Sequence, residues 1–366
     1  MYQNEKANKV GTEEKMKNEK KVIVPTGYMG SGSSAITDLM SEIEGVDVSR
    51  GTFEYVFLHC PNGVFDLEDK LLIGNNAVRS DEALHSFSKT MKQLYDKKYW
   101  WVGHYNKNVG VEFWNTTQKY LEQLIEYKND YYWYYQENVT PRMVPKLIWN
   151  RVLRMISRGK IQGEKVLAHE PMWVSFITPE RFYSITQNYI YDVLNMMGYD
   201  KDSMVLDQLL LPFNLFRIEK YFKEDVFVVV VERDPRDVFV SNKYYWSKQD
   251  GVVPYPTDVK KFCEYYKSMR KMEKEIDSSQ VYRVKFEDLI YRYDETVDDI
   301  FKRLDWDKCR HVRRKENFNP ERSIYNTQLF LKNDKCKEEC AVIEAKLKEY
   351  LYDFPYEIEH TGHDVF

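Results

Sequence analysis

The chain has 366 residues, of which 43% are hydrophobic and 31% are charged, proportions typical of a globular protein with a large core. Its 54 basic and 58 acidic residues give a net charge of −4, which argues against a general nucleic-acid binder because such proteins usually carry a basic excess. No apolar run approaches the ~18 residues of a membrane span. The first 20 residues are rich in Lys, Glu and Asn. We expect no membrane span, no secretory signal and a disordered arm over residues 1–20.

Five scattered cysteines do not form the paired pattern of a disulfide framework, which favours a reducing, cytoplasmic location. Cys336 and Cys340 have a spacing that a metal site can use, but no second Cys or His pair follows them. We therefore expect two ordinary thiols on a helix and no bound metal.

The ordered part of the chain opens with an apolar run, Val22–Pro25, that leads into a loop of glycines and serines, Gly27–Ser34. A helical pattern follows over Ser33–Ile43. A strand feeding such a loop at a helix start forms an anion site, because the amides of the first helical turn point at the ligand. The spacing of Gly27 and Gly32 matches a P-loop, but a serine stands where the Walker lysine would be. The loop therefore predicts a phosphate ligand other than ordinary Mg-ATP.

Strands and helices alternate further along the chain. The run Val226–Val231 is continuously apolar, as in a strand buried on both faces of a parallel sheet. This alternation predicts an α/β, three-layer P-loop NTPase-like fold with a central parallel sheet flanked by helices. The other expected strands are Lys165–Ala168, Met204–Leu206 and Val281–Val284. The other expected helices are Asp81–Tyr95, Thr117–Tyr127, Pro179–Met196, Pro235–Tyr245, Thr257–Ile276, Glu295–Leu304 and Lys335–Leu351.

A second phosphate-binding pattern follows the apolar strand. Arg233 stands at the strand end, Pro235 suits the first turn of a helix, and Ser241 lies further along that helix. A forked guanidinium and a hydroxyl placed this way can hold one phosphate. Beside Asp234 and Asp237, the same arginine also fits a salt-bridged helix start.

Together the two motifs resemble those of sulfotransferases that use 3′-phosphoadenosine 5′-phosphosulfate (PAPS), of the carbohydrate type and bacterial-like. The resemblance implies that Arg233 and Ser241 bind the 3′-phosphate. It also implies a loop around the 5′-phosphosulfate, formed by Tyr28, Met29, Gly30, Ser31, Gly32, Ser33 and Ser34. Two weaker matches are Phe286–Leu289, after an expected strand, and Phe318–Asn326, which is similar to the segment that closes over the nucleotide.

The resemblance covers roughly residues 21–332, where we expect the sulfotransferase domain. A C-terminal helix and tail are expected over 333–366. Residues 60–160 are expected to form a helical, aromatic-rich insertion on the acceptor side, with Trp101, His104 and Tyr105 as candidate substrate-binding residues. Aromatic faces pack against sugar rings, although the same residues can simply fill a partly wet helical insertion.

Gly30 departs from the family pattern, because most members carry Lys or Arg there to neutralise the transferring sulfuryl group. Candidates to replace that charge are Arg50, Arg79 and Lys315. Lys315 is also a candidate nucleotide-binding residue. Gly30 is the one feature that favours the alternative of a degenerate, non-catalytic nucleotide-binding module.

The acceptor hydroxyl needs a general base within hydrogen-bond reach. Glu54 occupies the place of the glutamate that carbohydrate-directed family members use, and His59 is the second candidate. His104 and His169 are further possibilities. A solvated carboxylate and packing histidines are the structural alternatives.

The sequence thus predicts a cytoplasmic enzyme that transfers a sulfuryl group from PAPS to a carbohydrate or glycoconjugate hydroxyl, releasing PAP, with no nucleic-acid partner. A P-loop kinase of a small molecule or nucleotide is the rival. The missing Walker lysine, and an arginine rather than an aspartate at the end of the apolar strand, count against the kinase.

Overall fold

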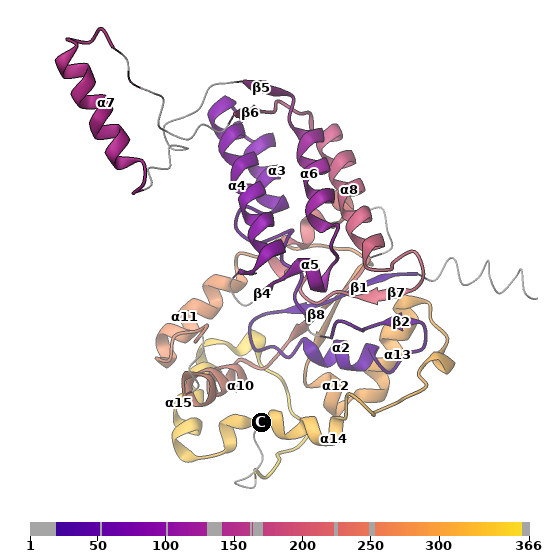
Figure 1. The fold of residues 1–366 in the computed structure, drawn as a ribbon. Coiled ribbons are helices and arrows are strands. Elements are labelled where there is room, and N and C mark those ends of the chain that lie inside the picture. Colours follow the sequence, from indigo (N-terminus) through magenta and orange to yellow (C-terminus); the bar gives the residue numbers. More distant parts are fainter. Residues whose placement is uncertain are drawn as a thin grey trace, which may run out of the picture.

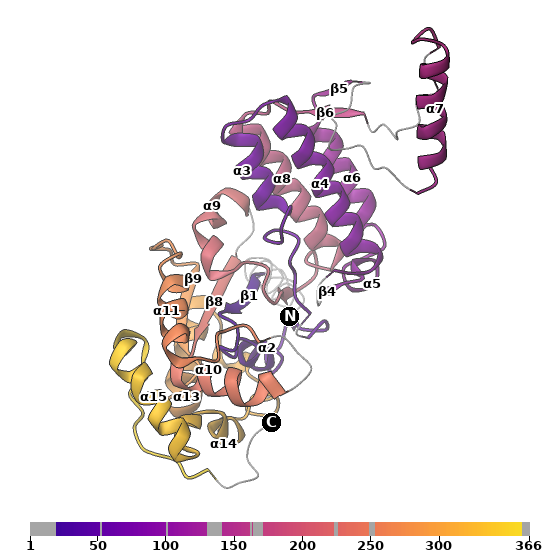
Figure 2. The same ribbon diagram turned by 90° about the vertical axis from the view of Figure 1, so that its left-hand side faces the viewer.

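The computed structural model describes residues 20–51, 53–99, 102–129, 141–161, 163, 171–222, 226–248 and 253–360. Within them a five-stranded sheet with the order β2–β7–β1–β8–β9 forms the centre (Figures 1 and 2). Every neighbouring pair in this sheet is parallel. Its strands are β1 (Val22–Gly27), β2 (Val46–Asp47), β7 (Ser203–Val205), β8 (Val226–Glu232) and β9 (Val281–Lys285).

The two central strands, β1 and β8, are in register from Val22–Val226 to Gly27–Val231. Successive residues of β8 enter different cores, as the two-residue period of a strand requires. Val226, Val228 and Val230 pack into a cluster on one face, whereas Phe227, Val229 and Val231 pack into another. The continuous apolar run therefore reflects burial on both faces, as the sequence predicted.

Helices cover both faces of the sheet (Figure 1). One face carries α2 (Ser34–Met40), α12 (Asp288–Tyr291) and α13 (Tyr293–Leu304). The other shares its core with a helical bundle built from α3 (Val64–Leu72), α4 (Ala77–Asp96), α6 (Phe113–Leu124) and α8 (Pro179–Met196). A third cluster joins α10 (Pro235–Val240), α11 (Val259–Arg270) and α15 (Asp334–Lys346). The expected three-layer α/β fold is confirmed.

Shorter elements complete the described chain. Two antiparallel pairs join β3 (Lys98–Tyr99) to β4 (Val102–Gly103) and β5 (Tyr127–Asn129) to β6 (Met172–Val174). The remaining α-helices are α5 (Tyr105–Asn108), α7 (Val144–Ile156), α9 (Ile218–Tyr221) and α14 (Pro320–Ser323). A π-helical turn spans Ser241–Tyr245, and 3₁₀ turns span Pro212–Arg217, Trp246–Lys248, Lys308–Arg310, Ile324–Asn326, Leu329–Leu331 and Lys348–Tyr350.

Several expectations differ from this arrangement or fall outside it, among them the helix expected over Thr257–Ile276, which ends at Arg270, and the arm over residues 1–20, of which only Lys20 is described. The expected strand Lys165–Ala168 lies outside the described residues. Tyr127, expected at the end of a helix, belongs to β5 instead, because α6 stops at Leu124 and the chain turns extended to pair with β6. The bundle also includes α8, so the helical part of the molecule runs beyond residue 160.

All five cysteines are free thiols, and Cys336 and Cys340 lie buried on α15. Among the residues that the structure describes, no helix combines the length and apolar character needed to cross a bilayer.

Candidate functional site

The glycine- and serine-rich loop connects the carboxyl end of β1 to the first turn of α2. The Ser31 N–H donates to the Tyr28 carbonyl at 2.9 Å, and the Ala35 N–H donates to the Gly32 carbonyl at 3.0 Å, so the chain reverses tightly into the helix. Gly30 and Gly32 have φ of 78° and 83°. The loop thus presents the amino end of α2, where anions bind most readily.

Arg233 links four separate segments of the chain. Its Nη1 donates to the Gly30 carbonyl at 3.0 Å and its Nη2 donates to the Asn326 carbonyl. The guanidinium lies over the Phe286 ring, 5.2 Å from its centre. Gly32 packs against the same ring. The structure therefore brings together all four stretches on which the family resemblance rests.

Three buried polar atoms of the loop and of the arginine–serine pair have no hydrogen-bond partner among the described residues. They are Ser31 Oγ, Arg233 Nε and Ser241 Oγ. Their residues are only 1%, 6% and 0% exposed. Because buried polar groups are normally hydrogen-bonded, two hydroxyls and one guanidinium Nε left unpaired here fit a ligand with acceptor oxygens, such as a phosphorylated nucleotide.

Gly30 is enclosed by the segment that follows Ser241. A Cβ atom built on Gly30 would lie 2.2 Å from the Trp246 ring, so no larger residue fits without displacing it. The Tyr255 hydroxyl donates to the Met29 carbonyl at 2.9 Å, which fastens the same segment to the loop. The place of the family's basic side chain is filled by an aromatic ring, and Arg233 is the described cation that hydrogen-bonds to Gly30.

Tyr28 and Met29 behave differently within the loop. Tyr28 is buried, its hydroxyl donates to Glu273, and Arg270 lies 4.4 Å from the centre of its ring. Burial raises the pKa of Tyr28, which keeps it a neutral hydrogen-bond donor. Met29 is 51% exposed. Tyr28 therefore anchors the loop to the protein, while Met29 faces outward.

Asp207 and Gln208, which sequence reasoning missed, lie just after β7 beside the loop. Gln208 accepts from Thr26 Oγ1 at 3.0 Å and donates to Ser33 Oγ at 3.1 Å, so it braces both ends of the loop. Asp207 accepts from Thr37 Oγ1 at 2.7 Å. Gln208 has φ 57°, an unusual value for a non-glycine residue, and the sequence carried no signal for this arrangement.

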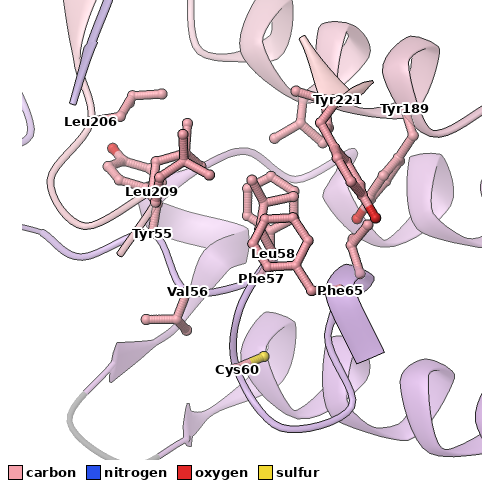
Figure 3. Close-up of a cluster of buried hydrophobic side chains, with 14 of the residues drawn as sticks. Tyr55, Val56, Phe57, Leu58, Cys60, Phe65, Tyr189, Leu206, Leu209 and Tyr221 are labelled. Carbon is pink, nitrogen blue, oxygen red and sulfur yellow. The ribbon is translucent and has the colours of Figure 1, made fainter. Parts of the chain in front are cut away.

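Glu54 is held near this corner by the segment that follows it. The Tyr55 N–H donates to the Asp207 carbonyl at 2.9 Å. Figure 3 shows the next residues, Val56 to Leu58, within a buried cluster that includes Leu206 and Leu209 from the chain around Asp207. Burial raises the pKa of Asp207 to about 7, and the nearby Glu54 charge adds to the increase. The structure therefore places Glu54 beside Asp207, at the same end of the sheet as the loop.

His59, the second candidate base, is engaged in holding Gln208. Its Nε2 lies 2.7 Å from the Gln208 carbonyl, and since a carbonyl only accepts, this nitrogen donates. Burial lowers the pKa of His59 to about 4, so the ring is neutral at physiological pH. Its geometry is that of a positioning residue.

The candidate replacement cations lie away from the loop. Arg50 donates to the Asn108 and Met197 carbonyls, and Arg79 donates to the carbonyls of Asp69 and Lys70. The Lys315 N–H donates at 3.0 Å to Glu42, which lies past the carboxyl end of α2, opposite the end that meets the loop. None of these contacts brings the three side chains to Gly30.

The candidate acceptor residues do not form one surface among the described residues. Tyr105 has no exposed area, and its hydroxyl accepts from the Val56 N–H at 2.8 Å. That environment makes it a core residue. His104 is exposed at the start of α5. Trp101 and His169 lie outside the described residues.

Two buried carboxylates shape the turn after β8. Glu287 accepts from the Asp234 N–H at 2.8 Å, and Asp237 accepts from the Gln328 and Leu329 amides at 2.8 and 2.7 Å. Burial raises the pKa of Glu287 to about 8 and that of Asp237 to about 7. These contacts fix the segment around Asn326 next to Arg233.

The glycine-rich loop at a helix start and the buried arginine–serine pair beside a parallel sheet are features expected of a nucleotide-phosphate-binding protein. A model described as the sulfotransferase family matches residues 75–309, more than half of the chain, and the chain belongs to this family. The match includes Arg233, Ser241 and Phe286 but begins after the glycine-rich loop. No curated protein matches the chain. Within the described residues, no group of three or more His, Cys, Asp or Glu side chains is arranged to hold a metal ion.

Proposed function

We propose that this sulfotransferase uses PAPS as its donor and transfers the sulfuryl group to a hydroxyl of a carbohydrate or glycoconjugate. The observation that carries the proposal is the set of unpartnered buried atoms, Ser31 Oγ, Arg233 Nε and Ser241 Oγ, in two segments joined by Arg233. One phosphate site at the loop and a second at the arginine–serine pair match a nucleotide phosphorylated at two positions.

Two groups of residues would bind different parts of the donor. The loop and the amino end of α2 would hold the 5′-phosphosulfate, whereas Arg233 and Ser241 would hold the 3′-phosphate. When bound, PAPS supplies the sulfuryl group for in-line displacement. Such transfer leaves the protein little covalent work, so positioning and preorganised donors provide most of the catalysis.

Glu54 is the proposed general base, which accepts the proton from the acceptor hydroxyl. Asp207, with a pKa near 7, is partly protonated at neutral pH and therefore repels the Glu54 carboxylate less than a fully ionised neighbour would. The engagement of His59 with Gln208 supports the choice of Glu54 over His59.

The carbohydrate acceptor, the cytoplasmic location and a sulfotransferase domain over residues 21–332, followed by a C-terminal helix and tail over 333–366, are further parts of this proposal. Glu54 at the place typical of carbohydrate-directed members supports the acceptor class. The five free thiols accord with a reducing compartment. The acceptor side is proposed at residues 60–160, without Tyr105.

The kinase alternative gains one feature from the structure. Asp207 follows β7, which is adjacent to β1, whereas the strand end that counted against a kinase in the sequence is that of β8, where an arginine stands. The Asp207 carboxylate is engaged by Thr37, and burial raises its pKa to about 7, which suits a metal-binding carboxylate poorly. The family match favours sulfuryl transfer over this alternative.

Thermal unfolding with PAP, PAPS and Mg-ATP tests the donor. At 100 times its Kd, PAP is expected to stabilise the protein by about 2.7 kcal/mol. Ser241→Ala should weaken PAP binding by about 1.5–3 kcal/mol, the value of a hydrogen bond to a charged group. It should leave adenosine 5′-phosphosulfate, which lacks the 3′-phosphate, nearly unaffected.

Ser247→Ala is the matched control, because the Ser247 hydroxyl donates to the Lys243 carbonyl on an exposed turn. Stronger stabilisation by Mg-ATP than by PAP would favour the kinase. If Ser241→Ala weakens the binding of PAP and of adenosine 5′-phosphosulfate equally, Ser241 is a structural residue. Labelled-sulfate transfer to polysaccharide fragments, phenols and steroids then tests the acceptor class.

A further inference from the structure

Helix α7 (Val144–Ile156) stands apart from the rest of the molecule in both views (Figures 1 and 2). None of its residues is buried. The strands on either side of it in the chain, β5 and β6, pair with each other, and Asn129 lies directly opposite Met172. The two ends of the intervening chain therefore meet at one point of the bundle, and no residue of α7 is buried in the core.

The helix is amphipathic, and its apolar side faces solvent. Leu147, Asn150 and Leu153 are partly covered, whereas the apolar residues on the other side are all exposed. These exposed residues, with 36–78% of their surface accessible, are Val144, Ile148, Trp149, Val152, Met155 and Ile156. An apolar stripe of this size, which no described residue covers, marks an interaction surface.

The charge of this segment is opposite to that of the whole protein. Residues 141–161 contain six basic and no acidic residues, in a chain whose net charge is −4. The basic residues are Arg142, Lys146, Arg151, Arg154, Arg158 and Lys160, and all of them are exposed. Arg151 and Arg158 border the apolar stripe at helical spacing, so their charges can reach past it toward headgroups.

From this combination we propose that α7 binds the surface of an anionic lipid bilayer, with its apolar stripe among the headgroups and upper acyl chains. Its 13 residues are too few to span a bilayer, which takes about 20. A basic amphipathic helix with an exposed tryptophan is suited to lie in the interface instead. A second copy of the chain is disfavoured as the occupant, since it would bring an equally basic surface. The proposal does not rest on the donor or acceptor proposed above.

Flotation of the full chain with lipid vesicles tests the proposal. The protein is expected to float with vesicles of equal parts phosphatidylcholine and phosphatidylglycerol, to bind pure phosphatidylcholine at least ~10-fold more weakly, and to be released by salt. Binding to both kinds of vesicle alike, or to neither, would overturn it.

Matched substitutions place the binding on α7. The double variant Met155→Ser with Ile156→Ser removes side chains that are 73% and 78% exposed, and should weaken vesicle binding at least ~10-fold. The control, Met272→Ser with Ile73→Ser, removes side chains that are 72% and 65% exposed elsewhere, and should bind as wild type does. An equal loss of vesicle binding in both double variants would contradict the proposal.

A charge pair and a deletion complete the test. Arg151→Gln with Arg158→Gln should weaken binding by roughly 5-fold per residue, whereas Arg292→Gln with Arg303→Gln, at the start of α13 and within it, should not. Replacing residues 131–170 by a short glycine turn should abolish flotation while PAP still raises the unfolding temperature. If the α7 variants instead convert a dimer into a monomer in sedimentation velocity, the stripe binds a second copy and the lipid proposal fails.

Discussion

Gly30 shows how one residue can move the charge of a site. The family's usual basic side chain cannot fit there without displacing Trp246, because its Cβ would lie 2.2 Å from the Trp246 ring, and the backbone has φ 78°. Arg233, which directly follows β8, reaches the same residue and donates to its carbonyl. We infer that Arg233 stabilises the loop and also belongs to the proposed 3′-phosphate site. The family motifs assign these two roles to separate segments of the chain.

Restoring the basic residue is therefore expected to harm the protein. Gly30→Lys should lower the free energy of unfolding by about 2–4 kcal/mol, the sum of a left-handed backbone and overpacking. Gly74→Lys is the control. Because Gly74 has φ 62° and open space around it, this variant measures the cost of the left-handed backbone without overpacking. Urea unfolding measures both. The double variant Gly30→Lys with Trp246→Ala should recover part of the loss; a stable, more active Gly30→Lys enzyme would contradict this account.

The carboxyl of Asp207 makes a specific contribution to pH dependence. Burial raises its pKa from 3.8 to about 7, so between these values the folded state binds more protons than the unfolded state. The contribution of Asp207 to stability is therefore fully favourable below about pH 4 and is lost as the pH rises to about 7.

Asp207→Asn should remove this dependence. The unfolding free energy of the wild type, relative to that of Asp207→Asn, should fall between pH 4 and 7, with a limiting slope of about 1.4 kcal/mol per pH unit. Asp294→Asn, at a side chain that is 76% exposed, is the control and should parallel the wild type. Parallel curves for the wild type and Asp207→Asn would show that Asp207 ionises normally.

At the scale of elements, the sequence was most informative where local signals agree. The continuous apolar run marked β8, and the helix expected over Pro179–Met196 has the bounds of α8, whose first residue is a proline. The end of α6 was missed because no glycine or proline follows Leu124; the helix stops where β5 pairs with β6, a contact made across the fold. Short strands such as β2 carry too few residues for a periodic pattern.

The residues of the candidate site likewise include some that local motifs identified and others that they did not. The loop serines and Arg233 lie in recognisable local motifs, so the sequence could identify them as phosphate-binding candidates. Gln208 and Trp246 reach the loop through contacts between residues far apart in the chain. For Trp246 the only local sign was the missing side chain at Gly30. When the role of a residue depends on partners far away in the chain, spacing and composition cannot predict it.

The segment from Glu54 to His59 carries the proposed base at one end and, at the other, the histidine that holds Gln208. Glu54→Gln keeps the shape but cannot accept a proton, so PAP affinity should stay near wild type while acceptor sulfation falls by about 10²–10⁴-fold. His59→Gln keeps a donor for the Gln208 carbonyl and should retain activity within about tenfold of wild type. Full activity in Glu54→Gln with loss in His59→Gln would make His59 the base.

At the scale of the whole molecule, α15 belongs to the core although it lies beyond the expected sulfotransferase domain. Cys340 and Ile343 pack against α10 and α11 in one buried cluster. Glu344 pairs with Arg236 at 2.8 Å, and the Tyr352 N–H donates to Asp234 at 2.9 Å. The C-terminal segment thus supports the turn that carries Arg233.

A chain that ends at Lys332 is therefore expected to fold poorly, although the sequence predicts that the sulfotransferase domain ends there. Removing Cys336, Cys340, Ile343 and Leu347, each at most 2% exposed, forfeits on the order of 5 kcal/mol of apolar burial, comparable with the stability of a typical domain. A chain ending at His360 keeps every one of these contacts and is the control. Thermal unfolding should give a cooperative, PAP-shifted transition for the control alone. A cooperative transition with a normal PAP shift in the chain ending at Lys332 would instead support an independent domain over residues 21–332.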